Sequence, residues 1–266
     1  MQMRAYRPNT PLWPLYRIYT RQLERDLADS TMPQHVGMII DGNRRWARQL
    51  GHDTVAAGHE AGARKTLEFL GWCERVGIPR VTLYLLSNDN LRSRSADELG
   101  PLIDIIQSLA RSIAAHEGWC VQHVGSSENL PDSLAHTLRE VEQASRAKTD
   151  EPTLHVNMAV GYGGRSEIVE AMRRIVRKSA DAGEDIAALA DRITPELIGE
   201  HLYTGGQPDP DLVIRTSGEQ RLSDFMLWQS AHSEFYFVEA LGPDLREVDF
   251  LRALRDFTQR ERRFGQ

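Results

Sequence analysis

The sequence predicts an α/β fold: a single domain with a central, mostly parallel six-stranded sheet flanked by helices. Two observations predict it. Short apolar runs alternate along the chain with longer amphipathic stretches. Several runs are also apolar at every position, as in strands that helices cover on both faces. The chain has 266 residues, 41% hydrophobic and 26% charged, which is typical of a globular protein that buries a full core.

The expected strands and helices follow one another in a regular rhythm. The runs that predict strands are residues 36–40, 81–86, 120–124, 154–160, 212–214 and 235–238. The stretches that predict helices are residues 60–76, 96–116, 131–146 and 166–182. Strand, helix and strand at this spacing indicate βαβ units, so most strands should be parallel. Residues 180–190 are acidic and rich in small side chains, which suits a surface helix or loop.

Residues 1–32 form an N-terminal helical segment before the domain of residues 33–266. Four large apolar side chains come close together on a helix in this segment, namely Trp13, Leu15, Tyr16 and Ile18. We expect such a helix to pack on the domain or on a second subunit. A weak contact with a membrane surface, or a lid over a binding site, is the alternative.

Composition excludes several classes of protein. With 32 basic and 38 acidic side chains the formal net charge is −6, which argues against a nucleic-acid binder. No apolar run approaches the roughly 18 residues of a membrane-spanning helix. Cys73 and Cys120 have no CxxC spacing, so we expect two structural thiols in a reducing compartment. The N-terminus has no secretion signal, which predicts a cytoplasmic protein.

The loop after the first expected strand combines a carboxylate with arginines. Ligands of open parallel sheets bind beyond the carboxyl ends of the strands. Asp41 stands at the strand end, and Gly42 permits a tight turn into a helix whose free N–H groups favour an anion. Arg44 and Arg45 can grip phosphate oxygens. A carboxylate beside phosphates requires a bridging divalent cation. The alternative is that Asp41 caps the helix and the arginines form a solvated face.

Two further strands are followed by polar loops. Ser87–Leu91 and the arginines after it either face a ligand or cap the following helix. Gly161–Arg165 lacks the spacing of a known phosphate loop, so it suits a tight turn in which Arg165 buttresses nearby loops.

The loop from Arg215 to Ser223 suits a second phosphate group. Glu234 could complete a metal site with Asp41, or form a salt bridge instead. Together these loops predict a site for two phosphorylated ligands and one Mg²⁺ ion. No dinucleotide fingerprint, Walker lysine or G-x-S-x-G elbow is present.

Five sequence blocks carry a resemblance to a known family. They are HVGMIIDGNRRWAR, GHEAGA, NMAVGYGGR, PDLVIRTSGEQRLSDFMLWQ and RERRFG, and they extend from His35 to Gly265. The chain resembles the cis-prenyltransferases, the undecaprenyl diphosphate synthase family, and among them the short-chain Z-isoprenyl (Z-farnesyl) diphosphate synthases.

The resemblance implies an apolar tunnel and a homodimer. It also implies that isopentenyl diphosphate adds to an allylic diphosphate, geranyl or dimethylallyl, with Mg²⁺ offsetting the charge of the diphosphates. Peripheral contact with the cytoplasmic membrane is the alternative expectation that the N-terminal helix raises.

The resemblance also implies residue roles. Asp41 and Asn90 would be catalytic, Asp41 at the metal and Asn90 in proton removal. Glu234 would be a second metal ligand from the region of the partner subunit. The residues implied in substrate binding are Gly42, Asn43, Arg44, Arg45, Trp46, His59, Ser87, Asn88, Asp89, Leu91, Arg94, Arg215, Arg221 and Ser223. Arg92 competes with Arg94 for its role. Arg262–Gly265 resembles a C-terminal motif that reaches the active site across the dimer.

Several departures from the long-chain pattern indicate a short product. Long-chain members read Ser-x-Glu-Asn-Trp where this chain reads Ser87-Asn-Asp-Asn-Leu91. Leu85 stands where alanine is common, and a larger side chain there would block elongation because packed interiors yield little. We therefore expect a product near farnesyl length. The alternatives are a long-chain polyprenyl diphosphate synthase, irregular lavandulyl-type coupling and a non-catalytic partner subunit.

Overall fold

The fold is built on six parallel strands. The structure is a computed structural model that describes residues 13–149 and 151–260. The strands are β1 (Val36–Ile39), β2 (Arg80–Ser87), β3 (Trp119–Val124), β4 (Leu154–Tyr162), β5 (Leu212–Arg215) and β6 (Glu234–Phe237). All six lie where the apolar runs predict them. Every pairing is parallel, which is stricter than the mostly parallel sheet expected.

The strand order places one crevice at the centre of the sheet. The order is β3-β4-β2-β1-β5-β6, so β1 lies between β2 and β5. The chain builds outward from β1 on one side through β2 to β4, and then returns to the other side of β1 for β5. Ligands of open sheets bind where the order changes direction in this way, beyond the carboxyl ends of the strands. The loops that follow β1 and β5 therefore meet at this point.

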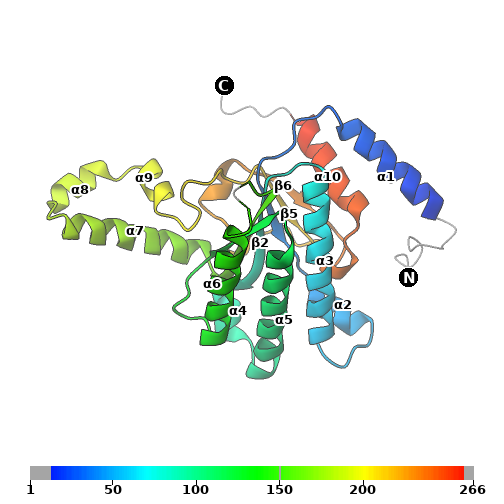
Figure 1. The fold of residues 1–266 in the computed structure, drawn as a ribbon, viewed down its shortest axis with the longest axis horizontal. Coiled ribbons are helices and arrows are strands. Elements are labelled where there is room, and N and C mark those ends of the chain that lie inside the picture. The colour runs from blue at the N-terminus through cyan, green and yellow to red at the C-terminus, as the bar shows by residue number, and fades with distance from the viewer. Residues whose placement is uncertain (1–12, 150, 261–266) are drawn as a thin grey trace.

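Helices surround the sheet. Their bounds are α1 (Trp13–Leu27), α2 (Asn43–Gln49), α3 (Ala56–Arg75), α4 (Asn88–Ser93), α5 (Ala96–Ala115), α6 (Asp132–Arg146), α7 (Gly164–Asp181), α8 (Ile186–Arg192), α9 (Pro195–Glu200) and α10 (Glu247–Gln259). In Figure 1, α3, α5 and α6 stand side by side, α1 lies beside α10, and α7 to α9 project to the left. The four long helices predicted between strands are confirmed as α3, α5, α6 and α7.

The other helices were not all predicted. The segment at 88–93 is a helix, α4, where we expected a polar loop. α10 carries a helical period of buried side chains, Phe250, Leu251, Leu254 and Phe257, that would have predicted it. α1 confirms the helix expected in the N-terminal segment, and α8 falls partly in the acidic stretch of residues 180–190.

The core lies on both faces of the sheet. The first, fourth and fifth strands are almost wholly buried, which matches their continuously apolar sequences, and β2 is buried over Val81–Leu83 and at Leu86. Cys73 and Cys120 are free thiols, and Cys73 is buried. In the part of the chain that the structure describes, no helix has both the length and the apolar character needed to cross a membrane.

Candidate functional site

A cavity of about 790 Å³ opens at the crevice between β1, β2 and β5. This volume lies in the range of small-molecule sites. Its lining includes most of the residues expected in the site: Asp41, Gly42, Asn43, Arg44, Arg45, His59, Leu85, Ser87, Asp89, Asn90, Arg94, Arg215, Arg221 and Ser223. The lining combines polar and apolar side chains. We call the part with Asp41 and the arginines the polar end, and the part with Leu85, Leu102, Ile105, Ile106 and Leu109 the apolar end.

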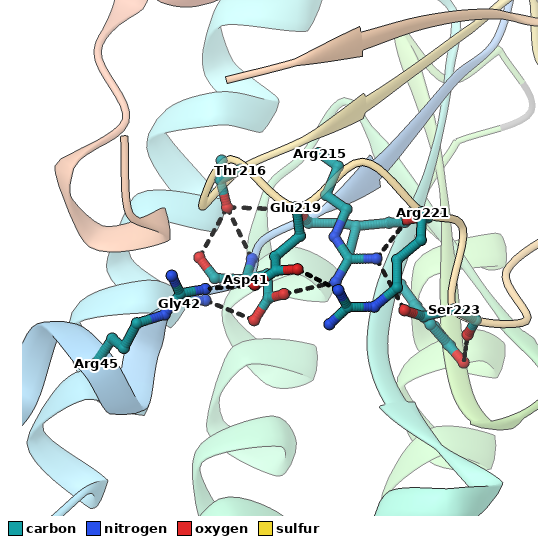
Figure 2. Close-up of polar contacts among 10 residues, drawn as sticks. Asp41, Gly42, Arg45, Arg215, Thr216, Glu219, Arg221 and Ser223 are labelled. Atoms are coloured by element: carbon teal, nitrogen blue, oxygen red, sulfur yellow. Dashed lines mark hydrogen bonds and ion pairs between the residues drawn. The ribbon is translucent and has the colours of Figure 1, made fainter. Parts of the chain in front are cut away.

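Asp41 lies at the polar end and is held by groups from both central loops. Its Oδ2 accepts a hydrogen bond from Arg215 Nη2 at 2.7 Å, and its Oδ1 accepts one from the Gly42 N–H at 2.6 Å (Figure 2). The Thr216 hydroxyl contacts the main-chain nitrogen of Asp41 at 2.7 Å and its oxygen at 2.8 Å. Burial works to raise the pKa of the Asp41 carboxyl, but the bonds from Arg215 and Gly42 outweigh burial and lower that pKa. Asp41 is therefore a carboxylate at neutral pH.

Gly42 makes the tight turn after β1 possible. Its φ is +96°, in the left-handed region that glycine favours. A Cβ at Gly42 would also lie 2.8 Å from Leu241. The turn starts α2 at Asn43 and brings Arg44 and Arg45 to the cavity, as the sequence predicted.

Arg215 organises the loop after β5. Its side chain is buried, and Nη1 donates to the Ser223 hydroxyl at 2.8 Å and to the main-chain oxygen of Arg221. Glu219 was not predicted. It pairs with Arg45 at 3.3 Å and with Arg221, so it lies between arginines of two different loops (Figure 2). The sequence could have indicated Glu219, because it stands between the two arginines of the Arg-Thr-Ser-Gly-Glu-Gln-Arg block.

A second cluster joins the loop after β2 to α2 and α3. Arg94 Nη1 lies 2.5 Å from Glu98 Oε1 and 3.2 Å from His59 Nε2. Glu98 also pairs with Arg44 Nε at 3.4 Å. Arg92 instead bonds Asp89 at 2.6 Å on the surface, so Arg94 is the arginine that faces the cavity. Glu98 was missed, although its spacing of four from Arg94 is that of a helical ion pair.

His59 is a neutral acceptor in this cluster. Burial lowers the pKa of its ring, and the charge of Arg94 lowers it further. Since Arg94 can only donate, the Nε2 atom of His59 accepts its hydrogen bond. The cluster thus offers the cavity the cationic groups of Arg44 and Arg94 and no charge from His59.

The loop after β5 is also fixed to the amino end of α7. Asp224 Oδ1 accepts from the Arg165 N–H at 3.0 Å, and its main-chain oxygen accepts from the Gly164 N–H at 2.7 Å. Tyr84 donates its hydroxyl to the Ser223 oxygen at 3.1 Å. Ser223 and Asp224 both have positive φ, 51° and 66°. The Gly161–Arg165 turn therefore supports a neighbouring loop, as expected. It does so through the main-chain N–H groups of Gly164 and Arg165, which donate to Asp224.

A bulge directs Leu85 into the cavity. Tyr84 pairs with Ala159 and Leu86 with Val160, so Leu85 has no partner in the register with β4. An extra residue of this kind re-aims the side chains around it. Consecutive residues of one strand, Tyr84 to Leu86, consequently all line the cavity.

Three of the expected substrate-binding residues do not line the cavity. Trp46 stacks on His52 with ring centroids 5.4 Å apart, Asn88 approaches Gly163, and Leu91 packs against the main core cluster. They flank the site, and their placement gives no direct support for contact with substrate. Arg262–Gly265 lies outside the described residues.

Glu234 does not join Asp41 within one chain. It begins β6, where the register pairs it with Leu212, and Leu212 pairs with Val36 at the start of β1. Asp41 lies five residues beyond Val36, or roughly 16 Å along the strand direction. Glu234 forms an ion pair with Arg260 instead. Within one chain the two carboxylates therefore lie toward opposite ends of the sheet and do not meet at one metal.

The residues at the polar end fit a Mg²⁺ ion held jointly with a phosphorylated ligand. Asp41 is ionised and partly exposed to the cavity, and Asn43 Oδ1 is a buried oxygen with no hydrogen-bond partner. Within residues 13–149 and 151–260 no three His, Cys, Asp or Glu side chains converge on one point. Such a site matches the habit of Mg²⁺, which takes one or two carboxylates and completes its shell with phosphate oxygens and water.

Known proteins are similar to this chain in sequence and in fold. The family model "Putative undecaprenyl diphosphate synthase" matches residues 39–265. Isoprenyl transferase 1 of Streptomyces avermitilis is 53% identical over 251 residues, which span 94% of this chain and 96% of that protein. The (2Z,6E)-farnesyl diphosphate synthase of Thermobifida fusca is 52% identical over 252 residues, which span 95% and 97%. The structure of lavandulyl diphosphate synthase from Lavandula x intermedia, in complex with dimethylallyl diphosphate, matches with a TM-score of 0.80 at 36% identity, covering 88% of this chain and 99% of that one.

Proposed function

This chain belongs to the undecaprenyl diphosphate synthase family and is a prenyl-transferring enzyme, and we propose that it makes a short-chain Z-isoprenyl diphosphate. In the proposed reaction isopentenyl diphosphate condenses with a short allylic diphosphate, geranyl or dimethylallyl, to a product of the Z,E-farnesyl type. Relatives named as (2Z,6E)-farnesyl or short-chain Z-isoprenyl diphosphate synthases, 49–52% identical over nearly the whole chain, support this substrate class.

The observation that carries the proposal is a cavity that is arginine-rich at one end and apolar at the other. Two diphosphates require cationic groups from more than one loop. Arg44 and Arg45 come from the start of α2, directly after β1, whereas Arg215 ends β5 and Arg221 lies in the loop that follows it. The apolar end, beginning at Leu85, suits a hydrocarbon tail that leads away from the diphosphates.

The residues of the polar end suit a condensation in which diphosphate leaves. The first loop, with His59 and Arg94, would hold the allylic diphosphate as its carbon–oxygen bond breaks. Arg215, Arg221 and Ser223 would hold isopentenyl diphosphate, whose double-bond electrons form the new bond to the allylic carbon. The resulting cation then loses a proton to form the new double bond. Asn90 lines the cavity beside Ser87, in a place suited to a part in that proton removal.

Asp41 would hold Mg²⁺ at this end of the cavity. When bound, the ion supplies neutralising charge for the diphosphate that departs. Asp41 itself keeps its negative charge through Arg215 and Gly42. Chelation of divalent ions with EDTA should therefore abolish turnover, with recovery on adding excess Mg²⁺.

We also propose a homodimer in the cytoplasm in peripheral contact with the membrane. β6 is an edge strand, and its aromatic residues Phe235, Tyr236 and Phe237 are only half-buried. Edge strands of this kind are commonly covered by a partner. A contribution of Glu234 to the metal site would then come from the second copy of the chain.

The test is product analysis of the purified enzyme. Labelled isopentenyl diphosphate and Mg²⁺ are supplied with dimethylallyl, geranyl or farnesyl diphosphate, and products are sized after removal of phosphate. A farnesyl-length Z product from geranyl diphosphate is expected. A ladder of long polyprenols would replace the proposal with a long-chain synthase. Coupling of dimethylallyl diphosphate with itself would indicate lavandulyl-type chemistry, and no product at all from a folded dimer would indicate a non-catalytic subunit.

A further inference from the structure

The N-terminal segment differs in charge from the rest of the chain. Residues 1–23 contain four arginines and no aspartate or glutamate. The whole chain has a formal net charge of −6, so the other 243 residues have a net charge of −10. A basic segment on an acidic protein indicates an anionic partner for that segment.

One face of α1 is fixed to the domain. Leu23 and Leu27 are buried, and α1 lies beside α10 (Figure 1). The Arg252 side chain of α10 lies over the Tyr19 ring at 5.1 Å, and its Nε donates to the Tyr19 hydroxyl at 3.2 Å. These contacts set the rotation of α1 about its axis, so they also decide which side chains face outward.

The outward face of α1 is both apolar and basic. Leu15 and Ile18 are each 62% exposed and lie three residues apart, on one side of the helix. Arg21 and Arg25 follow Ile18 at intervals of three and seven residues, on the same side, and Arg17 is next to it in sequence. In the described part of the chain, none of these three arginines forms an ion pair with an acidic side chain. The acids of α1, Glu24 and Asp26, lie at the two edges of this face, in line with Arg17 and Leu15 respectively but toward the other end of the helix.

We propose that this face, defined by Leu15, Arg17, Ile18, Arg21 and Arg25, binds the anionic headgroups of a lipid surface. A helix with exposed aliphatic side chains among arginines can lie in the plane of such a surface. The aliphatic groups then enter the headgroup region, and the arginines contact phosphates. The inference specifies the peripheral membrane contact proposed above and is independent of prenyl transfer.

The geometry favours a lipid surface over a second copy of the chain. The face is one convex helix with two aliphatic side chains, whereas a stable protein interface needs about 800 Å² from each partner. The arginines are long, exposed and without an acidic partner among the described residues, which suits many equivalent phosphate headgroups better than a few fixed acidic side chains. Binding should be weak, reversible and sensitive to salt.

Sedimentation of the full chain with vesicles tests the proposal. Vesicles of equal parts phosphatidylcholine and phosphatidylglycerol should bind the protein at low salt, and pure phosphatidylcholine should not. Each arginine near an anionic surface contributes roughly a factor of five, so the variant Arg17→Gln, Arg21→Gln, Arg25→Gln should bind about 100-fold more weakly. Leu15→Ser with Ile18→Ser should bind at least about tenfold more weakly.

The matched control is Val169→Ser with Ile186→Ser, which removes two exposed aliphatic side chains from α7 and α8. It should bind as tightly as the parent. All variants should keep their prenyl-transfer rate in vesicle-free solution, so a failure of lipid binding and a failure of the proposed enzyme activity are distinguishable.

Three outcomes would overturn the inference. Binding that does not depend on phosphatidylglycerol would show that the arginines do not contact anionic headgroups. Binding that is unchanged in the α1 variants would place the lipid contact elsewhere. Absence of binding, with a self-association that Leu15→Ser and Ile18→Ser abolish, would show that a second copy covers the face.

Discussion

Leu85 shows how one side chain can set product length. The bulge in β2 turns it toward the cavity, which Leu102 and Leu109 also line. A close-packed wall moves little, so a growing hydrocarbon chain would stop at Leu85.

Replacing Leu85 with alanine should lengthen the product. The Leu85→Ala enzyme should add one or more further isopentenyl units, which chromatography of the dephosphorylated products would detect. Leu67→Ala is the control, because Leu67 is also half-buried against the core but does not line the cavity. Both variants lose a similar packing energy, up to about 2–5 kcal/mol. Longer products from Leu67→Ala, or none from Leu85→Ala, would assign the length limit elsewhere.

His35 is the buried group that should dominate acid sensitivity. Its Nε2 lies 2.7 Å from the Thr82 hydroxyl and its Nδ1 2.7 Å from the Pro208 oxygen. Burial lowers the pKa of the ring from 6.5 to about 4. Between these values the unfolded chain binds a proton that the folded chain does not. The free energy of unfolding should therefore fall as the pH drops from 6.5 to 4, by up to about 3 kcal/mol from this residue.

Urea unfolding at several pH values would measure this loss. His35→Gln keeps a polar side chain but cannot titrate, so its free energy of unfolding should be lower at neutral pH and should decline less on acidification. His123→Gln is a comparison, since burial lowers the pKa of that ring as well. Equal pH slopes in the parent and in His35→Gln would show that His35 does not titrate as described.

At the scale of elements, the loop after β5 depends on a helix that is remote in sequence. Gly163 has no side chain to cap α7, and Asp224, which lies 59 residues beyond Arg165, supplies the missing acceptor to the Arg165 N–H. This bond holds Ser223, the neighbour of Asp224, in its left-handed conformation within reach of Arg215.

Loss of the Asp224 side chain should weaken binding of isopentenyl diphosphate selectively. In Asp224→Ala we expect the KM for isopentenyl diphosphate to rise about tenfold, the value of a lost charged hydrogen bond, with the allylic KM little changed. Asp224→Asn keeps an acceptor and should restore most of the affinity.

The control for this prediction is Asp185→Ala, which removes the acceptor that caps α8 through the Ala187 N–H at 3.2 Å. Asp185→Ala should lower the free energy of unfolding by about 1 kcal/mol, the usual value of a lost helix cap, and leave both KM values unchanged. An equal rise of both KM values in Asp224→Ala would mean a general disturbance of the cavity.

At the scale of the whole molecule, the positions of Asp41 and Glu234 require two chains if both act at one metal. In the proposed homodimer, Asp41→Asn and Glu234→Gln should each abolish activity. When the two are co-expressed with different tags, the mixed dimer carries one intact site, since both defects fall in the other site. The purified mixed dimer should then have about half of the parent activity, because one of its two sites is intact.

Activity of the purified mixed dimer, compared with each parent variant, measures this. A mixed dimer as inactive as its parents would place Glu234 outside the site. A fully active Glu234→Gln homodimer would do the same, and Glu234 would keep only its ion pair with Arg260.

The amino-acid sequence by itself determined the strands, the main helices and the loops that carry the chemistry. Strand and helix positions follow from local periodicity, and the Asp-Gly-Asn-Arg-Arg and Arg-Thr-Ser-Gly-Glu-Gln-Arg loops follow from local composition. Each of these features is complete within a few residues, so no knowledge of distant contacts is needed.

The tertiary structure alone decided which of these residues meet. Asp41 contacts Arg215, 174 residues away in sequence, because β1 and β5 are neighbours in the sheet. Glu234 does not approach Asp41 of its own chain, because β6 begins at the other end of the sheet. Strand order and register determine such distances, and neither can be read from the spacing of residues along the chain. The bulge at Leu85 has the same origin, because a bulge exists only relative to a paired strand.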